Sequence, residues 1–385
     1  MMRELSKIVT GIEPSGIRKF FDIVMEMKDA VSLGVGEPDF DTPWPIREEG
    51  IYSLERGRTF YTSNAGLAEL RAEIAKYISR LIGVDYAPEE EVIVTVGGSE
   101  GIDLAVRTLM NPGDEMIIPQ PSFVCYEPVC RLAGGQPVII DLKEGDDFKL
   151  RPEQVERAIT DKTKVLLLTF PNNPTGSIMT REELLPIAEL CIKHDLYVIS
   201  DEIYAELTYG GKHVSIAALP GMRERTVVIN GFSKAFAMTG WRLGFVCAPS
   251  FMAEHMYKVH QFGIMCAPTN AQYAAVVALR DCMRDVEKMV REYNRRRLYL
   301  INRLRRMGID CFEPFGAFYV FPSIRRFGLI SEEFATRLLM EQKVAVVPGT
   351  AFGRCGEGYL RISYAYSLAD LKEALDRMEA FVKGL

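Results

Sequence analysis

Short apolar runs alternate with helical stretches along the middle of this chain. The runs read EVIVTVGG, DEMIIPQPS, KVLLLTFP, DLYVISDEIY, RTVVINGFSK and RLGFVCAP. Residues 165–170 are apolar on both alternating faces, which is typical of a parallel strand that helices cover on both sides. The alternation therefore predicts an α/β layered structure over roughly 230 residues.

Further helices and short strands are predicted on either side of these runs. The pattern GLAELRAEIAKYISRLIG from Gly66 places its apolar side chains on one helical face. A long helix is expected over 284–307, then strands near 318–321, 344–347 and 359–363, and a last helix over 368–385. We therefore expect an α/β fold with two domains. The large domain, 47–283, has a mainly parallel central sheet covered by helices, and the smaller α/β domain is made of both chain ends, 1–46 and 284–385.

Charge and residue content argue against several classes of protein. The formal net charge is −6, so neither nucleic acid nor a membrane surface is an expected partner. The densest basic cluster, Arg295 to Arg297, is predicted to be a solvated face of the long helix.

Eight cysteines without a Cys-x-x-Cys pair indicate reduced thiols. No stretch has the apolar character of a signal peptide or a membrane span, so we expect a cytoplasmic protein. Only four histidines occur, and the spacing of His255 and His260 does not suit a metal site, so no metal is expected.

Glycine-rich, polar or charged residues directly follow four of the predicted strands. The strand at 92–96 runs into a glycine-rich turn at 97–101, and the strand at 166–170 runs into the turn PNNPTG. Asp201 follows the strand at 197–200, and Ser233 and Lys234 follow the strand at 227–230, with Arg242 eight residues further on. In a doubly wound sheet the loops at the carboxyl ends of the strands converge on the ligand crevice, so these residues are expected to form one site.

Each of these residue types has a chemical use at such an edge. A glycine-rich helix start can bind a phosphate through its backbone N–H groups, although neither a Gly-Lys-Ser/Thr nucleotide loop nor a complete dinucleotide fingerprint is present. Asp201 at the end of a buried strand needs a cation or a donor, such as a protonated ring nitrogen. Lys234 and Arg242 would make the pocket cationic, and the two prolines of the Asn-Pro turn would aim the amide of Asn173.

The motifs NPTG, SDEIY and SKAFAMTGWRLG, in this order, carry a family resemblance. The sequence resembles the fold-type I aminotransferases of the aspartate aminotransferase superfamily (class I/II), which use pyridoxal 5′-phosphate (PLP), and the resemblance covers essentially the whole chain. The segments LGVGEPDFDTP and GEGYLRISYA make it most similar to archaeal aromatic aminotransferases and bacterial N-acetyl-diaminopimelate aminotransferases. The resemblance implies a transaminase (EC 2.6.1.-) of amino-acid metabolism in which residues 47–283 bind PLP.

The resemblance also implies a role for each residue at the strand ends. Lys234 would form the Schiff base with PLP and move the Cα proton of the substrate, and Asp201 would pair with the ring nitrogen. Tyr204 and Asn173 would donate to the phenolic oxygen of the ring, on which Phe123 would stack. The phosphate would be held by Gly98, Ser99, Ser233 and Arg242.

The remaining implied roles concern the substrate and the assembly. Arg361 would bind the α-carboxylate of the substrate, with Gly36 and Asn173 at the same end of the site. Tyr61 would reach the cofactor phosphate of a neighbouring subunit, which requires at least a homodimer.

Two positions depart from the family pattern. Gly231 stands where many relatives carry a serine hydroxyl for the phosphate. Ser99 stands where bacterial aspartate aminotransferases of this branch carry a lysine that pairs with the distal carboxylate of the substrate. We therefore expect an L-amino acid with an aromatic, long neutral or acylated side chain as the donor, and a 2-oxo acid such as 2-oxoglutarate as the acceptor.

Two other functions fit part of the pattern. A PLP-dependent C–S β-lyase would use the same lysine, aspartate and arginine, and release of pyruvate and ammonia from cystathionine would distinguish it. A PLP-sensing transcription regulator reuses this fold behind a DNA-binding domain, for which the residues before Gly36 are too few.

Overall fold

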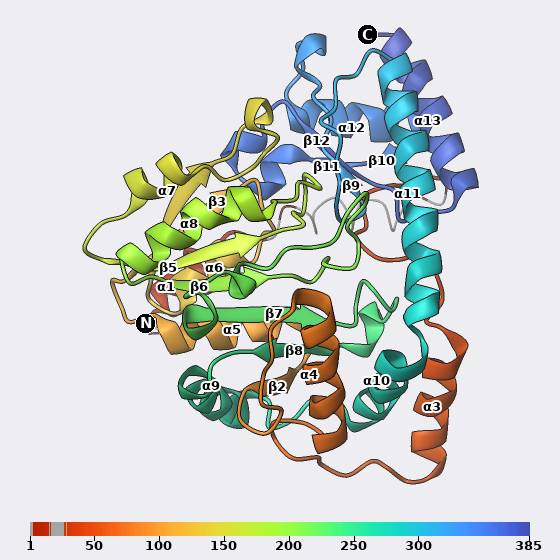
Figure 1. Cartoon of the computed structure of the whole chain (residues 1–385). Helices are drawn as coiled ribbons and strands as arrows, with labels where there is room; N and C mark the ends of the chain where they lie inside the picture. The colour runs from red at the N-terminus through yellow and green to blue at the C-terminus, as the bar shows by residue number, and fades with distance from the viewer. Residues whose placement is uncertain (1–2, 15, 17–26, 28) are drawn as a thin grey trace.

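Seven strands form the central sheet of the computed structural model, which describes residues 3–14, 16, 27 and 29–385 (Figure 1). Their order across the sheet is β2-β8-β7-β6-β5-β3-β4. Their bounds are β2 Val92–Thr95, β3 Glu115–Gln120, β4 Gln136–Asp141, β5 Thr163–Thr169, β6 Tyr197–Asp201, β7 Thr226–Gly231 and β8 Gly244–Cys247. The predicted α/β fold with a mainly parallel central sheet is confirmed.

Strand direction decides which residues meet at the sheet edge. Strands β3 to β7 pair in parallel, and β8 is antiparallel to both of its neighbours, β7 and β2. Strand β8 therefore begins at the edge where β2, β5, β6 and β7 end. This reversal brings Arg242, two residues before β8, next to the residues that follow the other strands.

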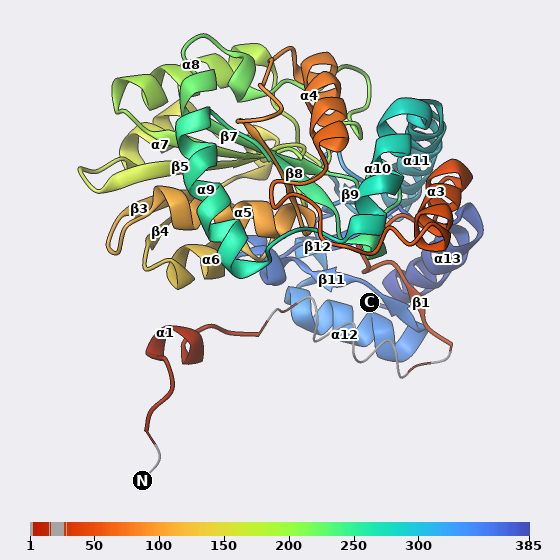
Figure 2. The same ribbon diagram turned by 90° about the horizontal axis from the view of Figure 1, so that it is seen from below.

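Helices cover both faces of the sheet because its strands are apolar on both faces (Figure 2). One face packs against α5 (Gly97–Leu109), α6 (Tyr126–Leu132) and α9 (Ser250–Gly263). The other face packs against α4 (Ala68–Ile82), α7 (Pro152–Ala158), α8 (Arg181–Lys193) and α10 (Thr269–Asp281). Neighbours such as Ile117 and Ile118 belong to opposite faces, as the two-residue period of a strand requires.

The C-terminal part contains α11 (Met283–Arg306), α12 (Ser331–Gln342), α13 (Leu368–Lys383) and the antiparallel sheet β11-β12-β9. Its strands are β9 Tyr319–Val320, β11 Val347–Pro348 and β12 Leu360–Ser363. Strand β1 (Val31–Ser32) pairs in parallel with β10 (Val344–Ala345), so the N-terminal segment joins these C-terminal elements. The proposed division between 47–283 and the two chain ends stays a prediction, and residues 1–2, 15, 17–26 and 28 of its N-terminal part lie outside the described residues.

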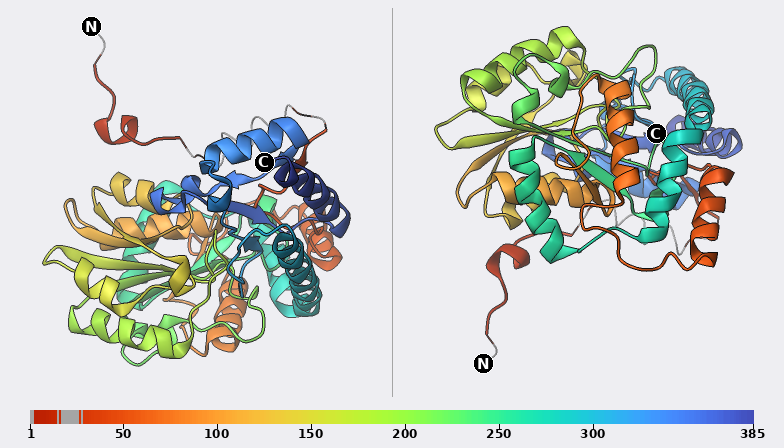
Figure 3. Two further views of the ribbon diagram at one scale, coloured as in Figure 1. Left: turned by 90° about the horizontal axis from the view of Figure 1, so that it is seen from above. Right: turned by 60° about the horizontal axis from the view of Figure 1, so that its bottom comes forward.

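The remaining elements connect these layers. Helix α3 (Trp44–Glu55) packs on α10, which also contacts α4 (Figure 3). The short helix α1 (Lys7–Thr10) contacts α6, and the chain before it extends away from the body of the molecule in Figure 2. Short 3-10 turns lie at Glu144–Asp146, Ile216–Ala218, Arg223–Arg225, Thr239–Trp241, Arg325–Phe327, Gly349–Phe352 and Arg354–Gly356.

Within the described residues, no helix combines the length and the apolar character needed to cross a bilayer. The cytoplasmic placement stays a prediction.

The prediction that Arg295 to Arg297 form a solvated face was wrong for two of the three residues. The side chain of Arg295 is 82% exposed, whereas Arg296 and Arg297 are buried in α11. Arg296 donates to Asp39 Oδ1 at 2.7 Å, and Arg297 donates to the carbonyl oxygen of Pro314 at 2.8 Å. Consecutive residues of a helix point about 100° apart, so three in a row point in three different directions. Loops from distant parts of the chain cover two of these directions, and only Arg295 stays exposed.

Candidate active site

A cavity of about 340 Å³ lies at the sheet edge where β2, β6 and β7 end. It brings together all but one of the residues predicted for the site, namely Gly36, Gly98, Ser99, Phe123, Asn173, Asp201, Tyr204, Ser233, Lys234, Arg242 and Arg361. The exception is Tyr61, which is 80% exposed and does not line this cavity.

Lys234 presents its amine to this cavity from the turn after β7. Its Nζ donates to the carbonyl oxygen of Gly36 at 2.6 Å. Burial, followed by the nearby positive charge of Arg361, lowers the pKa of Lys234 to about 8. A lysine in these surroundings gives up its proton far more readily than a surface lysine.

Asp201 is a buried carboxylate at the last position of β6. The hydroxyl of Tyr126 donates to Asp201 Oδ2 at 2.8 Å, and the backbone N–H of Ile203 donates to Oδ1 at 3.2 Å. Burial raises the pKa of Asp201 to about 6. Among the described residues its hydrogen bonds come from Tyr126 and Ile203 and none comes from a cation, so a protonated ring nitrogen would supply the cation that this carboxylate lacks.

Arg361 is a buried cation on β12, 2% exposed. Its Nη1 donates to Asn173 Oδ1 at 3.0 Å and its Nη2 donates to the carbonyl oxygen of Gly34 at 2.6 Å. Its Nε has no hydrogen-bond partner in the described part of the chain, and no carboxylate there pairs with the guanidinium. A buried guanidinium with an unused donor is suited to bind a carboxylate from outside the protein.

The start of α5 lies at one end of the cavity and has the groups that suit an anion-binding end. The helix begins at Gly97, which has a φ of 74°, and Gly98 and Ser99 of its first turn line the cavity together with Ser233 and Arg242. A Cβ on Gly97 would lie 2.7 Å from Arg242 Nη2, and one on Gly244 would lie 2.6 Å from the carbonyl carbon of Gly97. Glycine at both positions therefore lets the helix start approach the arginine, and the N–H groups and the guanidinium together favour a phosphate.

Several residues that line the cavity were missed in the sequence. The hydroxyls of Tyr204 and Tyr319 lie 2.8 Å apart, and Tyr126 reaches Asp201 from α6. The other missed lining residues are Val35, Glu37, Ile102, Thr169, Ile203 and Thr239. A buried tyrosine hydroxyl needs a polar partner, but the sequence does not show which partner it finds.

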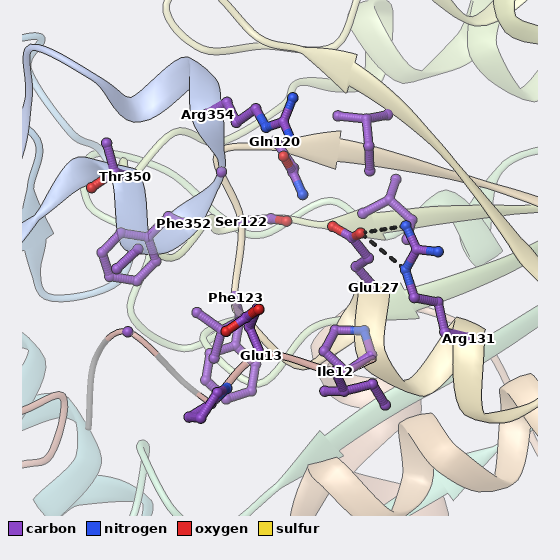
Figure 4. A pocket seen from close by; sticks show the side chains of 18 of the residues that line it. Ile12, Glu13, Gln120, Ser122, Phe123, Glu127, Arg131, Thr350, Phe352 and Arg354 are labelled. Atoms are coloured by element: carbon purple, nitrogen blue, oxygen red, sulfur yellow. Dashed lines mark hydrogen bonds and ion pairs between the residues drawn. The ribbon is translucent and has the colours of Figure 1, made fainter. Parts of the chain in front are cut away.

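A larger cavity of about 950 Å³ lies beside the first, between residues 11–14 and 16, α6 and residues 350–354 (Figure 4). Phe123 lines both cavities. The charged groups of Glu127 and Arg131 pair with each other there at 2.9 Å, as the dashed lines in Figure 4 show. The described residues that line this larger cavity include no lysine. Lys234, Asp201 and Arg361 line the smaller cavity.

The groups of the smaller cavity match the functional groups of PLP bound with an amino acid. Lys234 suits the aldehyde, Asp201 suits the ring nitrogen, and the start of α5 with Arg242 suits the phosphate. Arg361 remains for the carboxylate of the amino acid. The model of the family "Aminotransferase class I and II" matches residues 28–378. The chain belongs to this family.

This class I/II aminotransferase is therefore a PLP-dependent transferase, as the sequence predicted. It is 54% identical to "Putative aminotransferase YugH" of Bacillus subtilis over 99% of both chains. It is 48% identical to "Aspartate aminotransferase" of Pyrococcus abyssi over 97% of this chain and 96% of the relative. The crystal structure of an aromatic aminotransferase from Pyrococcus horikoshii superposes with a TM-score of 0.91 at 46% identity, covering 95% of this chain and 99% of the other.

Proposed function

We propose that this aminotransferase moves the amino group of an L-amino acid with an aromatic, long neutral or acylated side chain to a 2-oxo acid such as 2-oxoglutarate. The supporting observation is the set of charges in the cavity. Among its described lining residues the cations are Lys234, Arg242 and Arg361, and each already has a use in catalysis, phosphate binding or α-carboxylate binding. Ser99 adds no cation for a distal carboxylate, and Glu37 adds a negative charge to the lining.

The lining also favours an apolar donor side chain energetically. Val35, Ile102, Phe123 and Ile203 contribute apolar surface. An aromatic side chain placed against them gains about 25 cal/mol per Å² of apolar area buried, whereas a desolvated carboxylate without a cation costs several kcal/mol. The distal carboxylate of 2-oxoglutarate would be held by neutral donors, by water or by residues outside the described lining.

In this proposal, different residues of the cavity carry out different parts of the reaction. PLP supplies, when bound, an electron sink for the electron pair left as the Cα–H bond breaks. Lys234 Nζ takes up the Cα proton, and its lowered pKa makes the neutral amine that this step needs more available than it is on a surface lysine. Arg361 fixes the α-carboxylate and so orients the Cα–H bond toward Lys234, and Asn173 orients Arg361. Tyr204 and Tyr319 hold their hydroxyls at the cavity wall, where Tyr204 would donate to the phenolic oxygen.

A donor panel tests the proposed substrate class. With 2-oxoglutarate fixed, kcat/KM should be higher for phenylalanine, tyrosine or an acylated diamino acid than for aspartate. The relatives do not decide this point, since one is named for aspartate and a similar structure for aromatic amino acids. If aspartate outranks every aromatic and acylated donor, the argument from the cavity charges fails, while the transaminase activity stands.

The names of the relatives favour transamination over the C–S lyase reaction. Incubation with cystathionine should therefore release pyruvate and ammonia much more slowly than the amino group is transferred. A faster lyase rate would reverse this assignment.

We also propose that the enzyme acts as a homodimer in which Tyr61 serves the neighbouring site. Two segments expose a patch of large apolar side chains, with Phe60 and Tyr61 in one segment and Phe262, Ile264 and Met265 in the other. Phe60 is 81% and Phe262 89% exposed. The two segments of this patch are tied together, because Asn64 Nδ2 donates to the carbonyl oxygen of Met265 at 2.8 Å. A patch of large apolar side chains on a compact protein favours a second copy of the chain as its cover.

Subunit mixing tests the position of Tyr61. Lys234→Ala and Tyr61→Ala proteins should each be nearly inactive, and reassembly of a mixture should restore activity up to about one quarter of the sites. The reason is that a mixed dimer with Tyr61 acting across subunits has one site that carries neither change. If subunit exchange is confirmed but activity does not recover, Tyr61 acts in its own subunit or not at all.

A further inference from the structure

His260 is a fully buried histidine on α9 whose two ring nitrogens both bond to oxygen atoms. Its Nδ1 lies 2.7 Å from Glu100 Oε1, and its Nε2 lies 2.8 Å from the carbonyl oxygen of Asn64. A peptide carbonyl only accepts a hydrogen bond, so Nε2 carries a proton. The carboxyl group of Glu100 is the partner of Nδ1, so His260 and Glu100 form a buried hydrogen-bonded pair.

Within this pair, Glu100 stabilises the turn at the start of α5, which is the end of the cavity suited to an anion. Glu100 lies in the first turn of α5, and its Oε2 accepts the backbone N–H of Val96, the residue before the helix. The three residues between them are Gly97 to Ser99, and Gly98 and Ser99 of this turn line the cavity. The side chain of Glu100 is only 11% exposed, so without His260 its Oε1 would lose its hydrogen-bond partner in a largely buried place next to this turn.

The hydrogen bond between His260 and the carbonyl oxygen of Asn64 fixes the loop that carries Tyr61. Asn64 is three residues from Tyr61, and its side chain is also held, by Met265 and by Tyr257 of α9. Tyr61 is exposed and absent from the cavity of its own subunit. His260 therefore joins the phosphate turn of one site to the loop proposed to serve the other site.

We propose that His260 is a positioning residue that sets the affinity for the cofactor phosphate in two sites at once. It acts on its own site through Glu100 and the turn at Gly97 to Ser99, and on the site of the partner subunit through Asn64 and Tyr61. The second half of this proposal rests on the proposed homodimer.

The test compares PLP with pyridoxal, which lacks the phosphate, in titrations of the apoenzyme. His260→Gln should bind PLP roughly tenfold more weakly or worse, and pyridoxal nearly as well as before, because only the phosphate contacts are weakened. His255→Gln on the exposed face of α9 is the matched control and should change neither affinity. Equal losses for PLP and pyridoxal would mean a general structural role and would overturn the proposal.

Hybrid dimers separate the two halves of the proposal. When one subunit carries Lys234→Ala, a single lysine-bearing site remains, and His260→Gln is placed either on the subunit that owns this site or on its partner. PLP affinity at the remaining site should fall in both arrangements. A loss only when His260→Gln is in the owning subunit would overturn the link between sites. A hybrid without the His260 change shows first whether dimers form and bind PLP, so a failure of the proposed homodimer is recognised separately.

A second variant covers the case in which the buried carboxylate left by His260→Gln prevents folding. In a Glu100→Gln background no carboxylate is left without a partner, because the side chain is an uncharged amide. The amide oxygen can still accept the N–H of Val96. In this background His260→Gln should leave PLP affinity nearly unchanged in the owning subunit and still lower it roughly tenfold at the site of the partner. An unchanged affinity at both sites in this background would refute the role of the Asn64 contact.

Discussion

Lys234→Ala should lower the turnover number by about 10⁴-fold or more. The cavity has one lysine among its described lining residues, and its amine both meets the aldehyde of the cofactor and moves the Cα proton in our proposal. No neighbouring group offers a neutral amine, because the other cations of the lining are the guanidinium groups of Arg242 and Arg361. The measurement is the single-turnover rate with a good amino donor, followed by absorbance.

The matched control for this prediction is Lys212→Ala, since Lys212 is exposed on the surface. Its turnover should equal that of the unaltered enzyme. Borohydride treatment followed by peptide mapping should recover the pyridoxyl group on Lys234. Recovery of this group on another lysine would contradict the assignment directly.

Asp201→Ala should retain part of the cofactor but lose turnover by about 10³-fold, which corresponds to about 4 kcal/mol of transition-state stabilisation. The carboxylate of Asp201 is 6% exposed and holds a hydrogen bond from Tyr126. An ion pair with the ring nitrogen would keep this nitrogen protonated and the ring able to accept electrons, and alanine removes that charge. The measurement is kcat and kcat/KM at saturating PLP.

Asp161→Ala is the control for Asp201, because Asp161 is an exposed carboxylate just before β5 and far from any described role. It should leave both kinetic constants unchanged. Near-normal turnover of Asp201→Ala, with the fold confirmed by its melting temperature, would refute the role of the carboxylate as partner of the ring nitrogen.

Three of the site residues that the sequence predicted share one local property, which is their place at or shortly after the end of a buried strand. Asn173 follows β5, Asp201 ends β6 and Lys234 follows β7. Parallel strands bring their carboxyl ends to the same edge whatever the details of packing, so the local pattern was enough to predict that these residues meet. The family motifs then supplied the cofactor, which the match to the family model confirmed.

The sequence by itself thus determined the fold class, the chemistry and the edge of the sheet where that chemistry lies. The tertiary structure alone decided the contacts made across long distances in the chain. Tyr126 meets Asp201 across 75 residues, Tyr204 meets Tyr319 across 115, and His260 meets Glu100 across 160. It also decided that the reversed strand β8 brings Arg242 to the end of the cavity formed by the start of α5, and that Arg296 and Arg297 are buried. The physical reason is that strand and helix periods depend on neighbouring residues, whereas the partner of a buried polar group depends on which distant elements pack against it.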